Sequence, residues 1–337
     1  MRGAHEAAAF RGCALLAARG RVVVETCTDE VPNAGARFSI GSLQKQFTGL
    51  LVLELVRAGA LSLGDPIERH LPELAGAAAG RVTVSQLLHM TSGLPYTIGL
   101  WDNVTTQLTS AERSDADFLG IVRRNDLAFE PGTRDLYSNV GYGVLAILVG
   151  RVSHRPWRDV LTDRFSREGM VDTGLLPPRA GDERGVVVGH VPLRCGLAFS
   201  GVCPCEAPRW NYSLLPGGGV YSTVRDLFVW DRALRRLEDD SPDLYRAFMQ
   251  PSAWGFASGW GVTTRRLADG RDVTLYDYAG EDPGYYSFFA RIPHIDATVI
   301  VLSSTDFTLV RSNLDVFGAL MHIALGEPYE VPTARRR

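Results

Sequence analysis

The sequence contains very little lysine. Of its 337 residues, 35 are lysine or arginine, and Lys45 is the only lysine among them, so the other 34 are arginines. A guanidinium keeps its proton at any accessible pH, whereas burial and neighbouring charges can tune an ammonium until it releases one. Lys45 is therefore a candidate for proton transfer, although drift in an arginine-rich chain would also leave a single lysine.

Long apolar runs and a strong net charge are absent as well. No stretch reaches the roughly 18 to 20 apolar residues that a membrane span requires. The apolar residues near the start are interrupted by Arg11, Arg19 and Arg21, which does not fit a signal peptide. The formal net charge of -3 gives no electrostatic reason to expect nucleic acid or an anionic membrane as a partner. We therefore predict a cytoplasmic protein without nucleic-acid or membrane partners.

Cysteines are few and odd in number. The five cysteines favour buried thiols in a reducing compartment over a disulfide framework, although Cys13 and Cys27 could face each other across a first hairpin. Zinc-binding atoms occur at His190, Cys195, Cys203 and Cys205, but the spacing in "CPC" is too tight for a standard ligand pair. We expect no metal and no other cofactor.

Strand patterns lie at the two ends of the chain and helix patterns in the middle. Residues 12–27 alternate around Arg19-Gly20, a second hairpin is predicted through Asp269-Gly270, two more strands follow, and a helix from about Val310 to Leu325 comes last. We predict an α+β fold in which an antiparallel sheet from both termini is flanked by helices and receives an inserted, mostly helical region. One domain would cover residues 1–330, with its α/β part at 1–60 and 215–330 and its helical part at 61–214.

One apolar helix carries a possible nucleophile. The pattern predicts a helix from Ser42 to Ala58 with Gly59 as its C-terminal cap. Residues three apart share a helix face, so Lys45 would reach the hydroxyl of Ser42. Free backbone N–H groups and the positive end of the helix dipole lie at the same turn, which makes an activated serine plausible.

Two further segments could complete such a site. Tyr137-Ser138-Asn139 follows a Pro-Gly turn, and a tyrosine beside a cation can act as a base. Tyr278-Ala279-Gly280 ends a predicted strand, where a small residue lets backbone approach a bound group and the next amide can donate to an oxyanion. Taken alone, each segment is better explained by ordinary packing or a strand end.

Taken together and in this order, these motifs resemble the serine β-lactamase and penicillin-binding-protein superfamily, in its class C β-lactamase-like branch. Stretches such as "FSIGSLQKQFTG", "FEPGTRDLYSNVGYGVLAILV" and "YAGEDPGYYSFFARIP" extend the resemblance from about Gly12 to Leu325. It implies a β-lactamase/transpeptidase-like fold with Ser42 as nucleophile and with Lys45 and Tyr137 as proton-transfer groups. Asn139 would bind the acyl side chain or orient Lys45, and the N–H groups of Ser42 and Glu281 would form the oxyanion hole.

The position of Tyr278 departs from the penicillin-recognising members, which usually carry lysine or histidine there. The aromatic residue resembles the esterase and acyltransferase members instead. Glu281 and Asp282 follow at once, and they would repel a substrate carboxylate unless they form a solvated turn. Pocket shape would depend on the loop from Leu94 to Asp115 and on aromatic side chains that could equally be packing residues, namely Trp101, Trp210, Tyr212, Trp254, Tyr285 and Tyr286.

The resemblance implies a serine hydrolase that acts on a small-molecule ester or amide through an acyl-enzyme on Ser42. One alternative is an acyltransferase of a biosynthetic pathway, which would pass the same acyl group to a second acceptor. Another is a non-catalytic ligand-binding protein with the same fold. The sequence gives neither the acyl group nor the oligomeric state.

Overall fold

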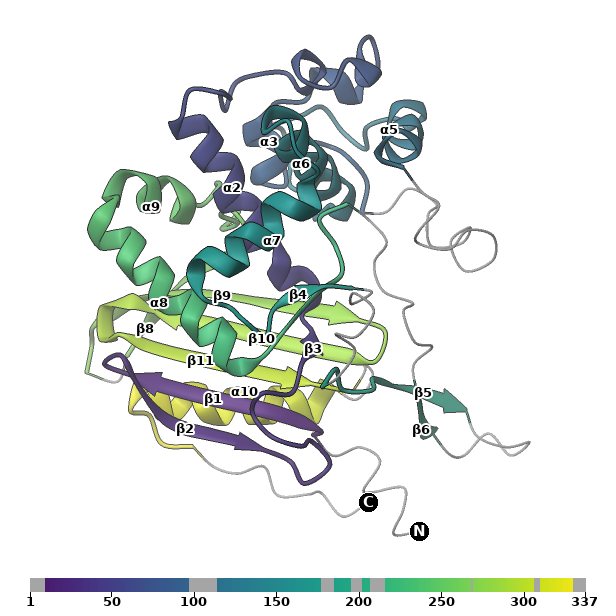
Figure 1. Ribbon diagram of the computed structural model, residues 1–337. Coiled ribbons are helices and arrows are strands. Elements are labelled where there is room, and N and C mark those ends of the chain that lie inside the picture. The colour runs from purple at the N-terminus through teal and green to yellow at the C-terminus, as the bar shows by residue number, and fades with distance from the viewer. Residues whose placement is uncertain are drawn as a thin grey trace.

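A computed structural model describes residues 10–96, 114–176, 185–194, 202–206, 216–267, 269–305 and 310–329. Six strands form the main sheet in the order β2-β1-β11-β10-β9-β8, and every neighbouring pair is antiparallel (Figure 1). These strands are β1 (Gly12–Ala18), β2 (Arg21–Cys27), β8 (Gly261–Arg266), β9 (Asp272–Asp282), β10 (Tyr285–Ile292) and β11 (Ala297–Ser303). The predicted α+β fold, with one sheet built from both ends of the chain, is confirmed.

Both predicted hairpins are present. β1 and β2 are joined through Arg19 and Gly20, whose φ angles of 52° and 71° are the left-handed values that tight hairpin turns use. β8 and β9 are joined across Gly270, with a φ of 84°. Turn chemistry visible in the sequence therefore located these strand pairs, although a bulge between Leu16 and Ala17 shifts the register of the first pair.

The sheet is buried on both faces, because successive residues of its central strands point to different cores. On one face, Leu15, Ile300 and Leu302 belong to a large core shared with α2 (Lys45–Arg57), α6 (Asn139–Val152) and α8 (Val224–Asp240). On the other face, residues such as Leu16, Val299 and Val301 pack with α10 (Val310–Leu325), which lies behind the sheet in Figure 1. Strands buried on two faces explain why "GCALLAA" and "ATVIVLS" are apolar without interruption.

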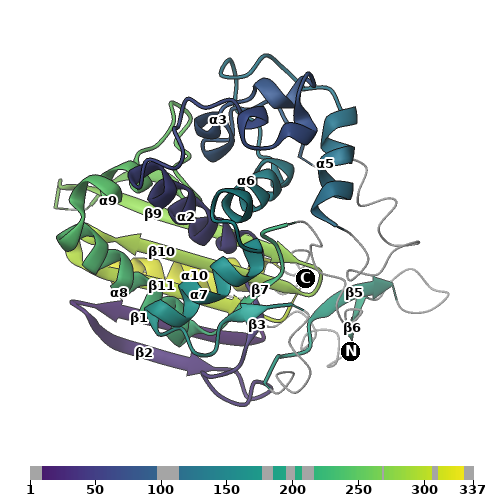
Figure 2. The same ribbon diagram turned by 45° about the horizontal axis from the view of Figure 1, so that its top comes forward.

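The region between the two parts of the sheet is largely helical, and Figure 2 shows α3, α5 and α6 grouped on one side of the sheet. Its elements are η2 (Ile67–Arg69), η3 (Pro72–Leu74), η4 (Ala79–Arg81), α3 (Val84–Leu88), α5 (Asp115–Arg124), α6 and α7 (Trp157–Glu168). After it come α8 and α9 (Pro242–Met249), and η5 (Pro293–Ile295) links β10 to β11.

The helical region also contains short strands that the sequence analysis did not predict. β4 (Gly174–Leu175) joins β3 (Phe38–Ser39) and β7 (Val220–Ser222) in a small sheet, and β5 (His190–Arg194) pairs with β6 (Val202–Glu206). Segments of two to five residues are too short to show a strand periodicity. The region at 61–214 is thus mostly, but not entirely, helical, and the extent of a single domain over 1–330 stays a prediction.

The helix caps explain where the helices of this half begin. Thr83 and Gln86 form the capping box that their spacing suggests, ahead of α3. Ser222, one of two adjacent residues in the sequence that could cap α8, belongs to β7. The cap is Thr223, whose hydroxyl accepts from the Asp226 amide at 3.0 Å. Serine and threonine are both favoured N-caps, so adjacent candidates are not separated by residue type alone.

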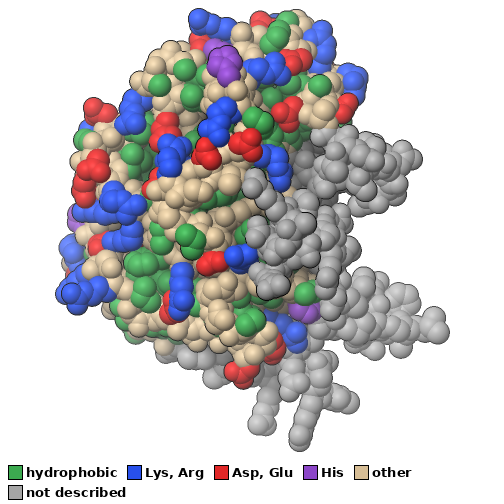
Figure 3. Space-filling model, viewed as in Figure 1, with side chains coloured by type: hydrophobic (Ala, Val, Ile, Leu, Met, Phe, Trp, Pro, Cys, Tyr) green, Lys and Arg blue, Asp and Glu red, His purple; other side chains and the backbone are tan. Residues whose placement is uncertain are grey.

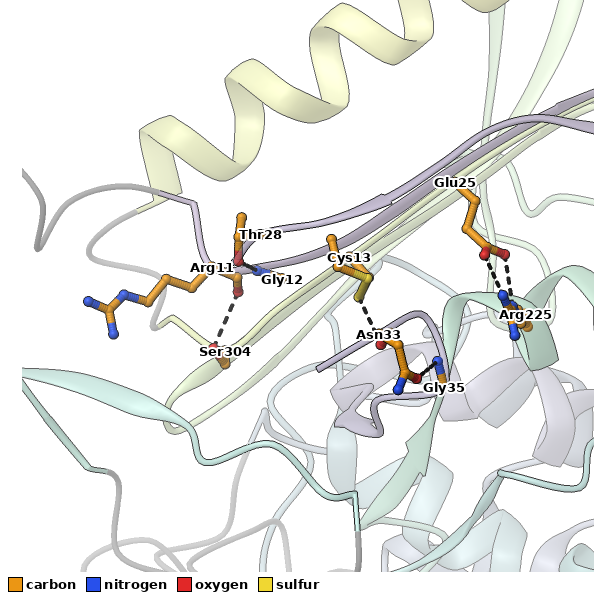
Figure 4. Close-up of a disulfide and its surroundings, with 10 residues drawn as sticks. Arg11, Gly12, Cys13, Glu25, Thr28, Asn33, Gly35, Arg225 and Ser304 are labelled. Carbon is orange, nitrogen blue, oxygen red and sulfur yellow. Dashed lines mark hydrogen bonds and ion pairs between the residues drawn. A yellow bond between two sulfur atoms is a disulfide. The ribbon is translucent and has the colours of Figure 1, made fainter. Parts of the chain in front are cut away.

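Cys13 and Cys27 form a disulfide, so the expectation of buried thiols is wrong for this pair (Figure 4). The two residues are direct partners in the β1–β2 register, and their Cα atoms are 4.1 Å apart. The disulfide removes the cysteine argument for a reducing compartment, and the cytoplasmic location stays a prediction. In the part of the chain that the structure describes, no helix is both long and apolar enough to cross a bilayer.

Acidic and basic side chains are interspersed over the face of the molecule in Figure 3. This distribution agrees with the small net charge of -3 and gives that face no strong field of one sign. The prediction that nucleic acid and membranes are not partners is untested.

Candidate active site

Ser42 lies in a tight turn at the edge of the main core. The sequence predicted one helix from residue 42, but Gly41–Gln44 form a 3₁₀ turn, η1, and the α-helix proper begins at Lys45. Lys45 nevertheless reaches back to Ser42, with its Nζ 3.0 Å from the Ser42 Oγ. Leu43 is fully buried and Lys45 is only 2 % exposed, so packing into the core holds the turn in place. Gly59, with a φ of 73°, follows the end of the helix as predicted.

Tyr137 and Asn139 reach the same place from the start of α6 in the helical region. The Tyr137 hydroxyl is hydrogen-bonded to the Ser42 hydroxyl. The Asn139 Oδ1 accepts from the Lys45 Nζ at 2.8 Å, and this Nζ also lies 4.9 Å from the centroid of the Tyr137 ring. The structure therefore brings four of the predicted site residues into one hydrogen-bonded group built from two distant parts of the chain.

Ser138 fixes the turn between Tyr137 and Asn139. Its hydroxyl accepts from the Gly141 amide and donates to the Pro95 carbonyl, both at 2.9 Å, so it caps α6 and ties down a second segment. The Asn139 amide donates to the Tyr96 carbonyl at 3.3 Å. The middle residue of the "YSN" motif thus holds its two neighbours in position.

Tyr278 faces this group from strand β9. Alternation along the strand puts Tyr276 and Tyr278 on the core that contains α2, and Val273 and Leu275 on the core that contains α10. The centroid of the Tyr278 ring lies 6.4 Å from that of Tyr137. Burial first, and the neighbouring Tyr137 next, raise the pKa of Tyr278 well above its usual value. Tyr278 therefore remains a neutral phenol at the site.

Gly280 is required by close backbone packing. A Cβ atom at this position would lie 2.0 Å from the Ile40 carbonyl oxygen. Gly41 meets the same strand from the other side, because its φ is 48° and a Cβ atom there would lie 2.5 Å from the Glu281 nitrogen. The small residue was predicted as space for a bound acyl group, but it first of all lets β9 lie directly against the residues before Ser42.

The side chain of Glu281 belongs to the opposite face of the sheet from Tyr278. Glu281 is the register partner of Tyr286. Burial, followed by the charge of Glu281, raises the pKa of Tyr286 to about 12. Tyr286 contacts Phe288, which stacks on Phe317 of α10. The backbone of Glu281 lies against Gly41, directly before Ser42.

Asp282 differs from Glu281 in its burial. Glu281 is exposed, in line with a solvated position, but Asp282 is only 8 % exposed and accepts a hydrogen bond from the Ser39 hydroxyl. The interpretation of both residues as a solvated turn is thus wrong for Asp282. Both lie in the last positions of β9, and the turn itself is made by Pro283 and Gly284.

Three aromatic residues that the sequence analysis did not assign complete the surroundings. The Tyr96 ring lies 5.5 Å from Tyr137 and is 54 % exposed, and the Phe256 ring lies 5.5 Å from Tyr278. Tyr142 is buried, with its ring centroid 5.7 Å from the Lys45 Nζ. Tyr142 could have been found from its place one turn after Asn139 on a predicted helix, whereas nothing in the sequence marked Tyr96 or Phe256.

Tyr96 is influenced by groups from both parts of the site. Burial is the main cause that raises the pKa of Tyr96, followed by the nearby Tyr137 and Glu281. Burial likewise raises the pKa of Tyr142 well above its usual value. Tyr96 and Tyr142 are therefore held in their neutral form.

The other predicted pocket residues contribute less. Tyr285 and Tyr286 are buried packing residues and Trp254 is 46 % exposed. Trp101, Trp210, Tyr212 and most of the loop from Leu94 to Asp115 lie outside the described residues.

No metal site is found among the described residues, in the sense that no three or more His, Cys, Asp or Glu side chains there are grouped to hold an ion. His190 has its Nδ1 3.2 Å from the Ser304 carbonyl oxygen, and Cys195 lies outside the described residues. The absence of a metal or cofactor from the chemistry stays a prediction.

The chain is similar in sequence to relatives of known name over most of its length. Penicillin-binding protein 4* of Bacillus subtilis (strain 168) is 28 % identical over 348 residues, covering 96 % of this chain and 74 % of the relative. Protein flp of Staphylococcus aureus is 24 % identical over 80 % of this chain, which spans only 53 % of that relative's length.

The fold itself is matched by solved structures. A penicillin binding protein from Bacillus halodurans superimposes with a TM-score of 0.74 at 22 % identity, covering 92 % of this chain and 97 % of the other. This match confirms the predicted fold. The family model described as Beta-lactamase matches residues 2–317, which is nearly the whole chain. The chain therefore belongs to the Beta-lactamase family.

Proposed function

We propose that the protein is a serine hydrolase that cleaves an ester or amide through an acyl-enzyme on Ser42. The observation that carries the proposal is the double contact of the Ser42 hydroxyl, which is hydrogen-bonded both to the Lys45 Nζ, at 3.0 Å, and to the Tyr137 hydroxyl. A nucleophile in contact with its base, which is in turn held by a third group, is the arrangement that covalent catalysis needs. Asn139 is that third group, because it accepts a hydrogen bond from Lys45.

In this mechanism the Ser42 oxygen attacks the substrate carbonyl while its proton passes to the coupled pair of Lys45 and Tyr137. The negative charge that develops on the carbonyl oxygen would be met by the amides of Ser42 and Glu281. Tyr137 then returns the proton to the leaving alcohol or amine. Water attacks the acyl-enzyme in the second half of the reaction and releases the acid and free Ser42.

The neutral phenol of Tyr278 supports a substrate without a carboxylate at that position. Its ring, those of Tyr96 and Phe256, and that of Tyr137 form a chain of aromatic contacts 5.5 to 6.4 Å apart beside Ser42. Such surroundings favour an apolar or aromatic group over an anion. We therefore place the protein with the esterase and acyltransferase members of the class C-like branch, acting in small-molecule metabolism.

Transfer to a second acceptor is the main alternative, because it uses the same acyl-enzyme and differs only in the nucleophile that enters second. The panel that separates the possibilities consists of p-nitrophenyl esters, D-amino acid amides and nitrocefin, each with and without an added amine or alcohol. A new acylated product that forms only with the added amine or alcohol indicates transfer. Tight ligand binding without any turnover would favour the non-catalytic alternative.

The test of the nucleophile is covalent labelling. A fluorophosphonate probe is expected to label the wild-type protein on Ser42 and to leave Ser42→Ala unlabelled. Lys45→Arg keeps the positive charge but cannot release its proton, so its ester hydrolysis should fall by roughly 10³-fold, within the range of lost general base catalysis. Equal labelling of wild type and Ser42→Ala would reject Ser42 as the nucleophile.

A further inference from the structure

A buried hydroxyl on strand β10 holds the backbone that precedes Ser42. Ser287 is fully buried, and its hydroxyl donates to the Ile40 carbonyl at 2.9 Å. The Gly280 carbonyl is the other acceptor within reach, at 3.3 Å, and Gly280 is the register partner of Ser287. A hydroxyl has a single proton, so the shorter contact to Ile40 is the principal hydrogen bond.

A second link lies one residue earlier in the chain. The Ser39 hydroxyl donates to the carboxylate of Asp282, and both residues are almost fully buried. The Ile40 amide is fixed from another direction by the Val220 carbonyl at 3.0 Å. Residues 39 and 40 are thus tied to the end of β9, to β10 and to β7 immediately before the turn that carries Ser42.

The backbone segments at this junction are tightly packed. The space for a Cβ atom on Gly280 is taken by the Ile40 carbonyl oxygen at 2.0 Å and by the Ser287 Oγ at 2.5 Å. On Gly41 the corresponding space is taken by the nitrogen and the carbonyl oxygen of Glu281, at 2.5 and 2.7 Å. The position of the Ile40–Gly41 peptide relative to Gly280–Glu281 therefore determines the distance between the amides of Ser42 and Glu281.

We propose that Ser287 is a positioning residue for the reaction, which acts through the Ile40 carbonyl to set the separation of the Ser42 and Glu281 amides. This inference rests on the proposed function, because those amides are the proposed oxyanion donors. Without the hydroxyl, the Ile40 carbonyl keeps the Leu43 amide, at 3.2 Å, as a donor from within its own turn but loses the link to the sheet. The turn could then move relative to β9 without unfolding.

The test compares Ser287→Ala with Ser303→Ala. Ser303 is a fully buried serine on the neighbouring strand β11, with its hydroxyl bonded to Thr305 at 2.7 Å and not to the Ser42 turn. Ser287→Ala is expected to lower kcat for a p-nitrophenyl ester by about 10- to 100-fold with KM within about threefold of wild type, since small misplacements of reacting groups have effects of this size. Ser303→Ala should lose a similar amount of stability but keep kcat within about threefold.

Amide hydrogen exchange of the peptide that covers residues 38–44 provides a readout independent of catalysis. It should be faster in Ser287→Ala than in either wild type or Ser303→Ala. Equal kcat values and equal exchange in the two variants would overturn the inference. Faster exchange in Ser287→Ala, in a protein whose Ser42 no probe labels, would support the link to Ile40 but refute the proposed function.

Discussion

The two faces of strand β9 carry different kinds of residues. Toward α2, the strand presents Tyr278 to the candidate active site and Gly280 to the backbone before Ser42. Toward α10, it presents Val273 and Leu275 to an apolar core, with Asp277 further along the same face. Successive side chains of a strand must point to opposite faces. A single strand can therefore shape the reaction on one side and contribute mainly to folding stability on the other.

The largest effect is expected from Gly280→Ala on the face toward α2. The new methyl group would meet the Ile40 carbonyl oxygen at 2.0 Å, and backbone on both sides has to shift. Ester hydrolysis should fall by about 10²- to 10³-fold, the loss seen when an oxyanion donor is removed. Kinetic assays of the purified variant measure this loss, and circular dichroism verifies that the variant is folded.

Gly318→Ala is the matched control on α10, where a Cβ atom would meet no heavy atom within 4 Å. This variant should keep full activity and gain about 0.5 to 1 kcal/mol, because alanine is favoured over glycine inside a helix. A Gly280→Ala variant as active as Gly318→Ala would contradict the division of roles.

Phe317→Ala should have the next largest effect, and on stability alone. Phe317 stacks on Phe288 across the α10 face of the sheet, with ring centroids 4.2 Å apart. Because Phe317 is only partly buried, the loss should lie at or below the low end of core phenylalanine truncations, about 2 to 3 kcal/mol. Urea denaturation measures the free energy of unfolding, and kcat measured well below the midpoint should stay unchanged. A large fall in kcat would show that the α10 face also shapes the site.

Asp277→Asn should have the smallest effect and a distinctive pH dependence. Burial raises the pKa of Asp277 to about 6 in the folded protein, above its value in the unfolded chain. Between about pH 4 and 6 the folded state thus binds more protons than the unfolded state, so stability falls as the pH rises through this window.

The variant should remove this dependence and stabilise the protein at pH 8 by about 1 to 2 kcal/mol, after allowance for the partial exposure of Asp277. Thermal unfolding of both proteins at pH 4.5 and pH 8 tests the prediction. A difference that does not change between the two pH values would contradict it, and activity at pH 8 should be equal in both proteins.

The sequence was sufficient for much of the fold because its signals are local. Arg19-Gly20 and Asp269-Gly270 mark turns, and the apolar runs of β1 and β11 mark strands that are buried on both faces. The short strands β4 to β7 were missed, because a strand of a few residues depends on its partners and not on its own pattern. The disulfide was left open for a similar reason, since pairing of Cys13 with Cys27 requires knowledge of the register.

The site was predictable only in part. Ser42 and Lys45 are three residues apart, so their contact follows from local geometry, whereas Tyr137 and Asn139 could be placed beside them only through the resemblance to a family. The roles of Ser287 and Asp282 depend on contacts between distant segments, and no spacing in the sequence indicates them. The direction of the Glu281 side chain required the register of β9 and β10.

The order of strands in the sheet has a consequence for how the chain is made. β1 lies between β2 and β11. It therefore lacks its second partner strand until residues 297–303 have left the ribosome. Until then its apolar faces are uncovered, and such long-range pairing is slow and prone to aggregation. The turn that carries Ser42 likewise cannot meet β9 before Asp272–Asp282 have been synthesised. The arrangement around Ser42 therefore forms only after β9 is available, although Ser42 itself is translated early.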